Sequence, residues 1–176
     1  MAKRFYNDAF LFSQQACSSP KVIFWVGEKN DKYNEFWECV RKETYRFDNN
    51  ATMVMDRLVA VDEIITRGNI VRGDVGSFPV RIECNSLKHV RDYHCGNGLF
   101  FELMVDKLED VLNHTKDKDQ TMIQYGFSKD ELNSFVCNIK NRSIDRIVNF
   151  GQALDFNYVW DGINLYDAFS RQITVT

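Results

Sequence analysis

Residues 10–27 read FLFSQQACSSPKVIFWVG, and they place Cys17 between an apolar helix and an apolar strand. Two glutamines precede this cysteine, and two serines and a proline follow it. Such a junction lifts a side chain out of the packed interior and leaves backbone N–H groups without helical partners. A thiol nucleophile that attacks a carbonyl group requires an accessible sulfur with N–H donors nearby. Cys17 is therefore the first candidate for a catalytic residue.

Helix and strand patterns alternate outward from this segment. Periodicity predicts helices over 2–14, 31–47, 51–67, 107–115, 128–139 and 163–170, and strands over 21–27, 69–73, 80–84, 99–106, 121–126, 146–150 and 173–176. Residues 22–26 and 99–105 are almost continuously apolar, as in strands covered on both faces. Ser128 and Glu131 form a capping-box pattern. The sequence therefore predicts an α/β fold with a mostly parallel sheet covered by helices.

The composition indicates one domain that binds neither nucleic acid nor a membrane. The chain has 176 residues, 44% hydrophobic and 27% charged, which suffices for one domain with its own core. No apolar run is long enough to span a bilayer, and the N-terminus lacks the apolar core of a signal peptide. A net charge of −3 with mixed signs gives no electrostatic basis for binding nucleic acid. Five cysteines without C-x-x-C spacing favour reduced thiols in the cytoplasm over disulfides or a metal site.

A second candidate site is His94-Cys95-Gly96-Asn97-Gly98. Two glycines before an apolar strand allow unusual backbone angles and the close approach of a ligand, although a tight loop into the strand is the simpler interpretation. A Cys17–His94 pair is conceivable, but the sequence does not place the two together. Cys39, Cys84 and Cys137 are interpreted as core thiols because each lies in an apolar helix or strand.

The segment around Cys17 resembles the catalytic-cysteine segment of the aldehyde dehydrogenase superfamily. There too an aromatic-rich helix leads to a glutamine two residues before the nucleophile and then to a β-strand; here these are Phe12, Gln15, Cys17 and the strand from Lys21. An aromatic, acidic helix start at 33–37 continues the match. The branch with the greatest similarity is the fatty acyl-CoA reductases of bacterial bioluminescence systems. Residues 14–20 resemble their active-site segment, and residues 145–148, 151–154, 160–162 and 170–171 resemble their C-terminus.

The resemblance implies reduction of a long-chain acyl-CoA or acyl-protein thioester to a fatty aldehyde. Cys17 would form an acyl-cysteine, and NADPH would supply the hydride. Gln15 and Ser18 would orient the substrate, and His94 and Gly96 would contact the cofactor. The glutamate pattern Glu-x-Phe-Gly-Pro, with which the family holds the cofactor ribose, is missing from this sequence.

The resemblance covers nearly the whole chain but only the last part of such an enzyme. The sequence has neither Gly-x-Gly-x-x-Gly after a strand nor a Gly-x-x-x-x-Gly-Lys loop. Residues 1–176 are therefore expected to be a single thiol-bearing, catalytic-type domain with a C-terminal tail. A nucleotide-binding domain or subunit would be a partner, and by resemblance the chain would form a homo-oligomer. Two alternatives stay open: a non-catalytic oligomerisation or partner-binding fragment, and a cofactor-free cysteine acyltransferase or thioesterase that uses Cys17 and His94.

Overall fold

A four-stranded sheet forms the centre of the molecule in the computed structural model, which describes residues 1–28, 30–67, 70–140 and 142–175. The strand order is β1-β4-β3-β2. The strands are β1 (Val22–Val26), β2 (Ile70–Asp74), β3 (Val80–Cys84) and β4 (Leu99–Val105). β1 and β3 pair with β4 in parallel, and β2 is antiparallel to β3 at one edge. The predicted mostly parallel α/β sheet is confirmed.

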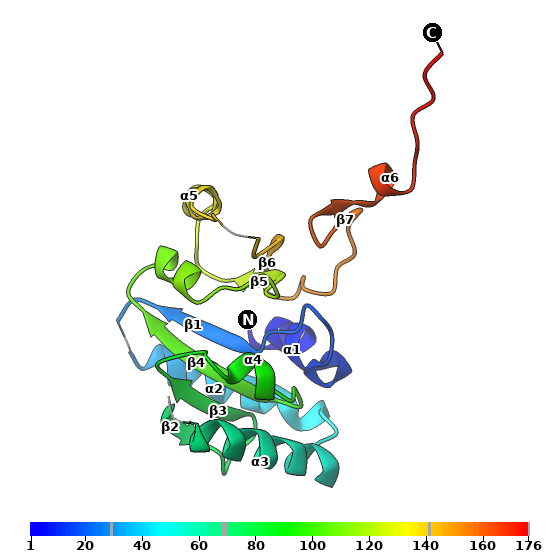
Figure 1. Cartoon of the computed structure of the whole chain (residues 1–176). Coiled ribbons are helices and arrows are strands. Elements are labelled where there is room, and N and C mark those ends of the chain that lie inside the picture. The colour runs from blue at the N-terminus through cyan, green and yellow to red at the C-terminus, as the bar shows by residue number, and fades with distance from the viewer. Residues whose placement is uncertain (29, 68–69, 141, 176) are drawn as a thin grey trace.

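Helices cover both faces of this sheet (Figure 1). α1 (Ala2–Phe10) and α2 (Lys32–Glu43) pack on one face, and α3 (Ala51–Thr66) packs on the other. Side chains of β4 alternate between the two, because successive residues of a strand point to opposite faces. Phe101 belongs to the core beneath α3 and Phe100 to the aromatic core beneath α1 and α2, and both are 0% exposed. Burial on both faces explains the apolar run that the sequence shows in this strand.

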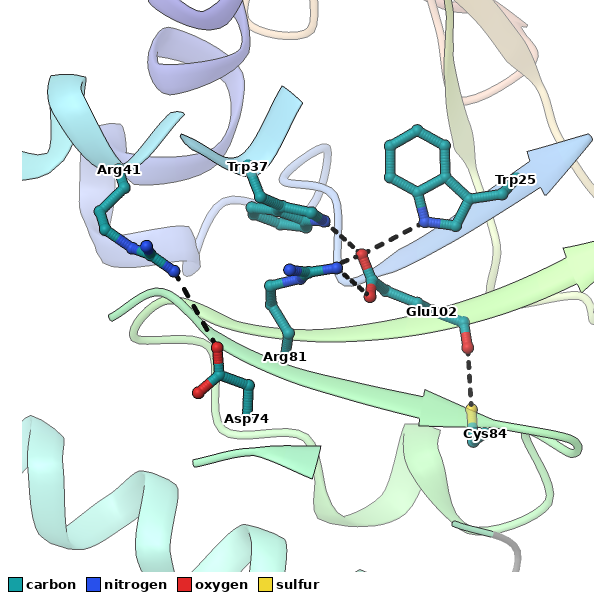
Figure 2. Close-up of polar contacts among 7 residues, drawn as sticks. All are labelled: Trp25, Trp37, Arg41, Asp74, Arg81, Cys84 and Glu102. Atoms are coloured by element: carbon teal, nitrogen blue, oxygen red, sulfur yellow. Dashed lines mark hydrogen bonds and ion pairs between the residues drawn. The ribbon is translucent and has the colours of Figure 1, made fainter. Parts of the chain in front are cut away.

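One charged residue interrupts that run at the centre of the sheet. Glu102 of β4 is 6% exposed and lies on the α2 face, where three donors converge on its carboxylate (Figure 2). Trp25 Nε1 donates to Oε1 at 3.2 Å, Trp37 Nε1 donates to the same oxygen, and Arg81 Nη2 donates to Oε2 at 3.0 Å. The guanidinium of Arg81 also lies over the Trp37 ring, 5.0 Å from its centroid. The buried carboxylate is therefore fully hydrogen-bonded and paired with a cation.

A smaller parallel pair of strands lies next to the β1 side of the main sheet (Figure 1). β5 (Thr121–Gln124) pairs with β6 (Arg146–Asn149), and the helices around them are α5 (Lys129–Cys137) and the 3₁₀ helix η3 (Leu108–Asn113). The capping box predicted at Ser128 is confirmed, since Ser128 Oγ accepts from Glu131 N and the Glu131 carboxylate accepts from Ser128 N. Asp8 of α1 ties this part to the rest of the chain, because its carboxylate accepts from Gly151 N at 2.5 Å and Ala153 N at 2.9 Å.

Several predicted boundaries are wrong. The helix predicted over 2–14 ends at Phe10 and continues as the distorted 3₁₀ turn η1 (Leu11–Gln14), because residues 12–14 adopt positive φ. In place of the helix predicted over 163–170 there is a hairpin and one helical turn that Asn164 caps, and residues 173–175 form no strand. Residues 69 and 176, which two predicted strands include, lie outside the described residues. The remaining elements are η2 (Thr44–Arg46), α4 (Val90–Tyr93), β7 (Val159–Trp160), β8 (Ile163–Asn164) and α6 (Leu165–Ala168).

A search of the described helices finds none with the length and apolar character needed to cross a bilayer.

Candidate active site

Cys17 lies on an exposed turn between η1 and β1. Ser19 N donates to Ala16 O at 3.0 Å and closes this turn. The backbone N–H groups of Cys17 and Ser18 have no acceptor within the described part of the chain. An accessible thiol beside free backbone donors is the arrangement that nucleophilic attack on a carbonyl group requires.

The side chain of Gln14 fixes both ends of this turn to the start of β4. Gln14 is 0% exposed and has φ of 62°. Its Nε2 donates to Pro20 O at 2.7 Å and to Leu99 O at 3.0 Å, and its Oε1 accepts from Gly98 N at 2.8 Å. Three hydrogen bonds from one buried amide hold the turn against the sheet, and the position of Cys17 depends on them.

Gln15, predicted to orient a substrate, instead contacts the loop before β4. Its Nε2 donates to Cys95 O at 2.8 Å and approaches Asn97 Oδ1 at 3.4 Å. Gly96 lies beneath it with φ of 74°, and a Cβ atom there would come within 2.5 Å of Gln15 Nε2. The structure therefore brings together the two segments that the sequence singles out, and Gly96 is the residue that allows their close approach.

His94 is held within the same loop by both ring nitrogens. Gly96 N donates to Nδ1 at 2.8 Å, so the proton of the neutral ring lies on Nε2, which donates to Leu99 O at 2.9 Å. Burial lowers the pKa of His94 to about 4, and the nearby positive charge of Lys21 makes a smaller contribution in the same direction. No hydrogen bond joins His94 to Cys17 among the described residues.

The two serines after Cys17 are buried. Ser18 is 4% exposed and Ser19 is 6% exposed. Within the described residues, Ser19 Oγ is the buried side-chain oxygen or nitrogen that lacks a hydrogen-bond partner. Ser18, predicted to orient a substrate, therefore exposes little of its surface to a ligand.

The other cysteines differ from Cys17 in burial or in position. Burial raises the pKa of Cys84 to about 12 and that of Cys95 to about 11, so both are protonated near neutral pH. Cys84 is buried as predicted. Cys39 and Cys137 are exposed, which corrects their interpretation as core thiols: each lies on the outer side of its helix.

Cys17 is exposed, and it lines neither the cavity beside α2 nor the cavity beside α3 in the described part of the chain. One cavity of about 510 Å³ lies between α2 and the β2–β3 side of the sheet. The other, of about 190 Å³, lies between α3 and the turn that joins β2 to β3. A substrate bound at Cys17 would therefore need a second surface to enclose it.

The residues expected to contact NADPH do not fit that role. Both ring nitrogens of His94 are bonded within the loop, and Gly96 is covered by Gln15. Low pKa also keeps His94 uncharged near neutral pH, so it offers no cation to a phosphate.

Sequence reasoning missed three residues that shape the site: Gln14, Asn97 and Arg57. Asn97 has φ of 58°. Its backbone N–H donates to Ser13 O at 3.0 Å, and its backbone carbonyl accepts from Arg57 Nη1 at 2.6 Å. One signal was present, since asparagine between two glycines is typical of left-handed backbone. The sequence does not distinguish Arg57 from a solvent-exposed charged residue on an amphipathic helix.

No protein-family model and no curated protein matches the sequence. Among solved structures, the chain is similar to aldehyde dehydrogenase 21 from Physcomitrella patens in complex with the reaction product succinate. The TM-score is 0.56 at 10% identity, over 87% of this chain and 35% of that one. It is also similar to glyceraldehyde-3-phosphate dehydrogenase GapN from Methanocaldococcus jannaschii, complexed with NADP. There the TM-score is 0.54 at 13% identity, over 90% of this chain and 38% of that one.

The chain thus spans little more than a third of the length of either structure. At these identities the similarity shows a shared fold, and the chain has an aldehyde dehydrogenase-type α/β fold. The finer resemblance to bioluminescence-type acyl-CoA reductases stays a prediction.

Proposed function

We propose that this chain is the acyl-accepting part of an aldehyde dehydrogenase-type oxidoreductase that acts on long-chain acyl thioesters. The observation that carries the proposal is the exposed sulfur of Cys17, on a turn fixed by Gln14, in a fold shared with aldehyde dehydrogenases. The free backbone N–H of Cys17 supports it, because such a donor stabilises the oxyanion that forms on attack.

In the proposed reaction the Cys17 thiolate attacks the carbonyl carbon of the thioester. The new carbon–sulfur bond forms as the carbonyl oxygen takes up negative charge. Collapse of this intermediate breaks the bond to the carrier, which leaves as a thiolate and takes up a proton from solvent. The product is an acyl-cysteine, and no external oxidant or reductant is consumed in this half of the reaction.

Reduction of the acyl-cysteine to an aldehyde belongs, in this proposal, to a partner domain or subunit that holds NADPH. Two findings support the assignment to a partner: Cys17 lies on open surface, and the loop of His94 is closed by its own hydrogen bonds. The partner surface would also enclose the acyl chain.

The experiment is acylation of the chain by a long-chain acyl-CoA, followed by intact-mass and peptide mass spectrometry. We expect one acyl adduct, located on Cys17, that hydroxylamine removes. Cys17→Ala should abolish the adduct. Cys39→Ala and Cys137→Ala are the matched controls and should leave it unchanged, because their thiols are exposed without a comparable turn. An adduct spread equally over the three exposed thiols, or none on a Cys17 that iodoacetamide modifies, would contradict the proposal.

A second role, in self-association, is favoured by the C-terminal segment. Residues 156–175 extend away from the body of the molecule (Figure 1), and Phe156, Phe169 and Ile173 are 76%, 87% and 75% exposed. Apolar surface of this extent is typical of interaction sites. The test is sedimentation velocity of the full chain and of Phe169→Ser/Ile173→Ser, which should shift a homo-oligomer to smaller species. Identical sedimentation of the two proteins would remove the support for this role.

A further inference from the structure

A buried arginine without a carboxylate partner lies far from the turn of Cys17 in the sequence. Arg57 of α3 is 4% exposed. Its Nη1 donates to Asn97 O at 2.6 Å and its Nη2 donates to Asn49 Oδ1 at 2.6 Å, and both acceptors are neutral. No carboxylate of the described residues forms an ion pair with it. The charge of Asp56 acts on Arg57 only at longer range, and Asp56 is itself bonded to Asn97 Nδ2 at 3.1 Å. The guanidinium lies over the Phe78 ring, 5.0 Å from its centroid. Burying such a cation is costly unless an anion compensates it.

Arg57 lines the cavity of about 190 Å³ between α3 and the β2–β3 turn. The polar lining of the cavity comes from Arg57, Asn49 and the turn at Gly76 and Ser77. The rest of the lining is apolar and consists of Val54, Leu58 and Val61 of α3, Val75 and Phe78 of the turn, and Val80 of β3.

The polar lining offers several free hydrogen-bond donors. A guanidinium carries five N–H donors, and hydrogen bonds to the described residues use two of those on Arg57. Asn49 Oδ1 already accepts from Arg57, which leaves its amide N–H groups as the free part of that side chain. The backbone N–H groups of Gly76 and Ser77 have no acceptor in the described ranges. Free N–H donors around a positive charge favour the binding of an anion.

We propose that this cavity binds a short aliphatic carboxylate, with its carboxylate group on Arg57 and its hydrocarbon part against Val54, Leu58 and Val75. The planar guanidinium matches a carboxylate in two parallel hydrogen bonds. Apolar walls disfavour phosphate, because they would leave some of its oxygens without donors. Cys17 does not line this cavity, and the proposal does not depend on the function proposed above, although Arg57 also holds the loop before β4 through Asn97 O.

The experiment is a titration of the full ¹⁵N-labelled chain with butyrate, acetate and inorganic phosphate, followed by NMR of the Gly76 and Ser77 amides. We expect saturable shifts with butyrate, weaker binding of acetate and no saturable binding of phosphate. Arg57→Met should weaken butyrate at least about tenfold, because a charge-assisted pair is lost. Arg171→Met removes the same charge from the exposed tail and should change the affinity less than about twofold.

A second variant guards against misfolding of Arg57→Met. Val75 is 48% exposed and is not a hydrogen-bond partner of Arg57, so Val75→Trp fills the cavity while leaving the hydrogen bonds of Arg57 in place. It should also weaken butyrate at least about tenfold in a folded protein. Unchanged butyrate affinity in Val75→Trp, or equal affinities for phosphate and butyrate, would overturn the proposal.

Discussion

Phe12, Ser13 and Gln14 have φ of 60°, 52° and 62°, although none of them is glycine. Left-handed backbone costs about 1 kcal/mol or more at each such residue. The hydrogen bonds of Gln14 to Pro20, Leu99 and Gly98 offset this cost, and Asn97 N adds another at Ser13 O. A strained backbone held by its surroundings gives the turn of Cys17 one defined conformation.

The low pKa of His94 makes stability depend on pH. The folded protein binds a second proton on this ring only near pH 4, whereas the unfolded chain binds it near the ordinary histidine pKa of 6.5. The unfolded state therefore binds more protons between these values, and folding stability falls as the pH decreases through this window. His94→Gln keeps one donor and one acceptor but does not titrate. Relative to the wild type, the free energy of unfolding of His94→Gln should increase by on the order of 2–3 kcal/mol as the pH falls from 7 to 4.

Urea unfolding of both proteins at several pH values measures this change. A difference that stays constant across the window would show that His94 is not the titrating group.

At the scale of elements, the identity of helices and strands followed from the sequence more closely than their ends did. Ser128 starts α5 as predicted, because a capping box is a local interaction. The break after Phe10 was not predicted, since its cause is the contact of Gln14 with Leu99 and Gly98, far away in the sequence. Glu102 was not recognised as buried either, because its partners lie on three other elements.

We expect substitution of Arg81 alone to cost more stability than substitution of Arg81 and Glu102 together. Arg81→Met leaves a buried carboxylate without a cation and should cost about 3–5 kcal/mol of unfolding free energy. Adding Glu102→Gln should recover much of that loss, because the amide oxygen still accepts from Trp25 and Trp37 while the buried charge is gone. Urea unfolding of the single and double variants gives the coupling energy.

The control for this cycle is the exposed pair of Arg67 and Glu63, with an N–O distance of 2.9 Å. Glu63→Gln should cost less than about 1 kcal/mol, because solvent screens this pair. Equal losses in Arg81→Met and Glu63→Gln would contradict the account of the buried pair.

At the scale of the whole molecule, the sequence predicted the α/β class, because strand and helix patterns alternate and two strands are continuously apolar. It also located the two segments that meet at the candidate site, around Cys17 and at 94–98. It did not predict how they meet, since Gln15 is joined to Cys95 and Asn97 across a large separation in the chain. Such contacts depend on which strands become neighbours, and local patterns do not encode that order.

Asp8 is expected to control the attachment of the segment after β6. Its carboxylate accepts from two backbone N–H groups, of Gly151 and Ala153, and burial raises its pKa despite them. Asp8→Ala leaves both donors without an acceptor and should cost about 2–4 kcal/mol. Hydrogen exchange at Gly151 and Ala153 should accelerate more than in the core of β4.

Lys3→Ala, an exposed change on the same helix, is the control and should leave exchange at these amides unchanged. Acceleration spread evenly over the molecule in Asp8→Ala would mean that Asp8 supports the entire fold and has no special role for this segment.

The position of β1 in the sheet has a consequence for biosynthesis. β1 is an edge strand whose neighbour is β4, and Val22 is in register with Phe101. On a translating ribosome, β1 emerges long before β4, the strand with which it pairs. Closing so long a loop is slow, and exposed apolar strands associate with other chains during the delay. We therefore expect β1 to lack its strand partner, and to be prone to association, until Val105 has left the exit tunnel.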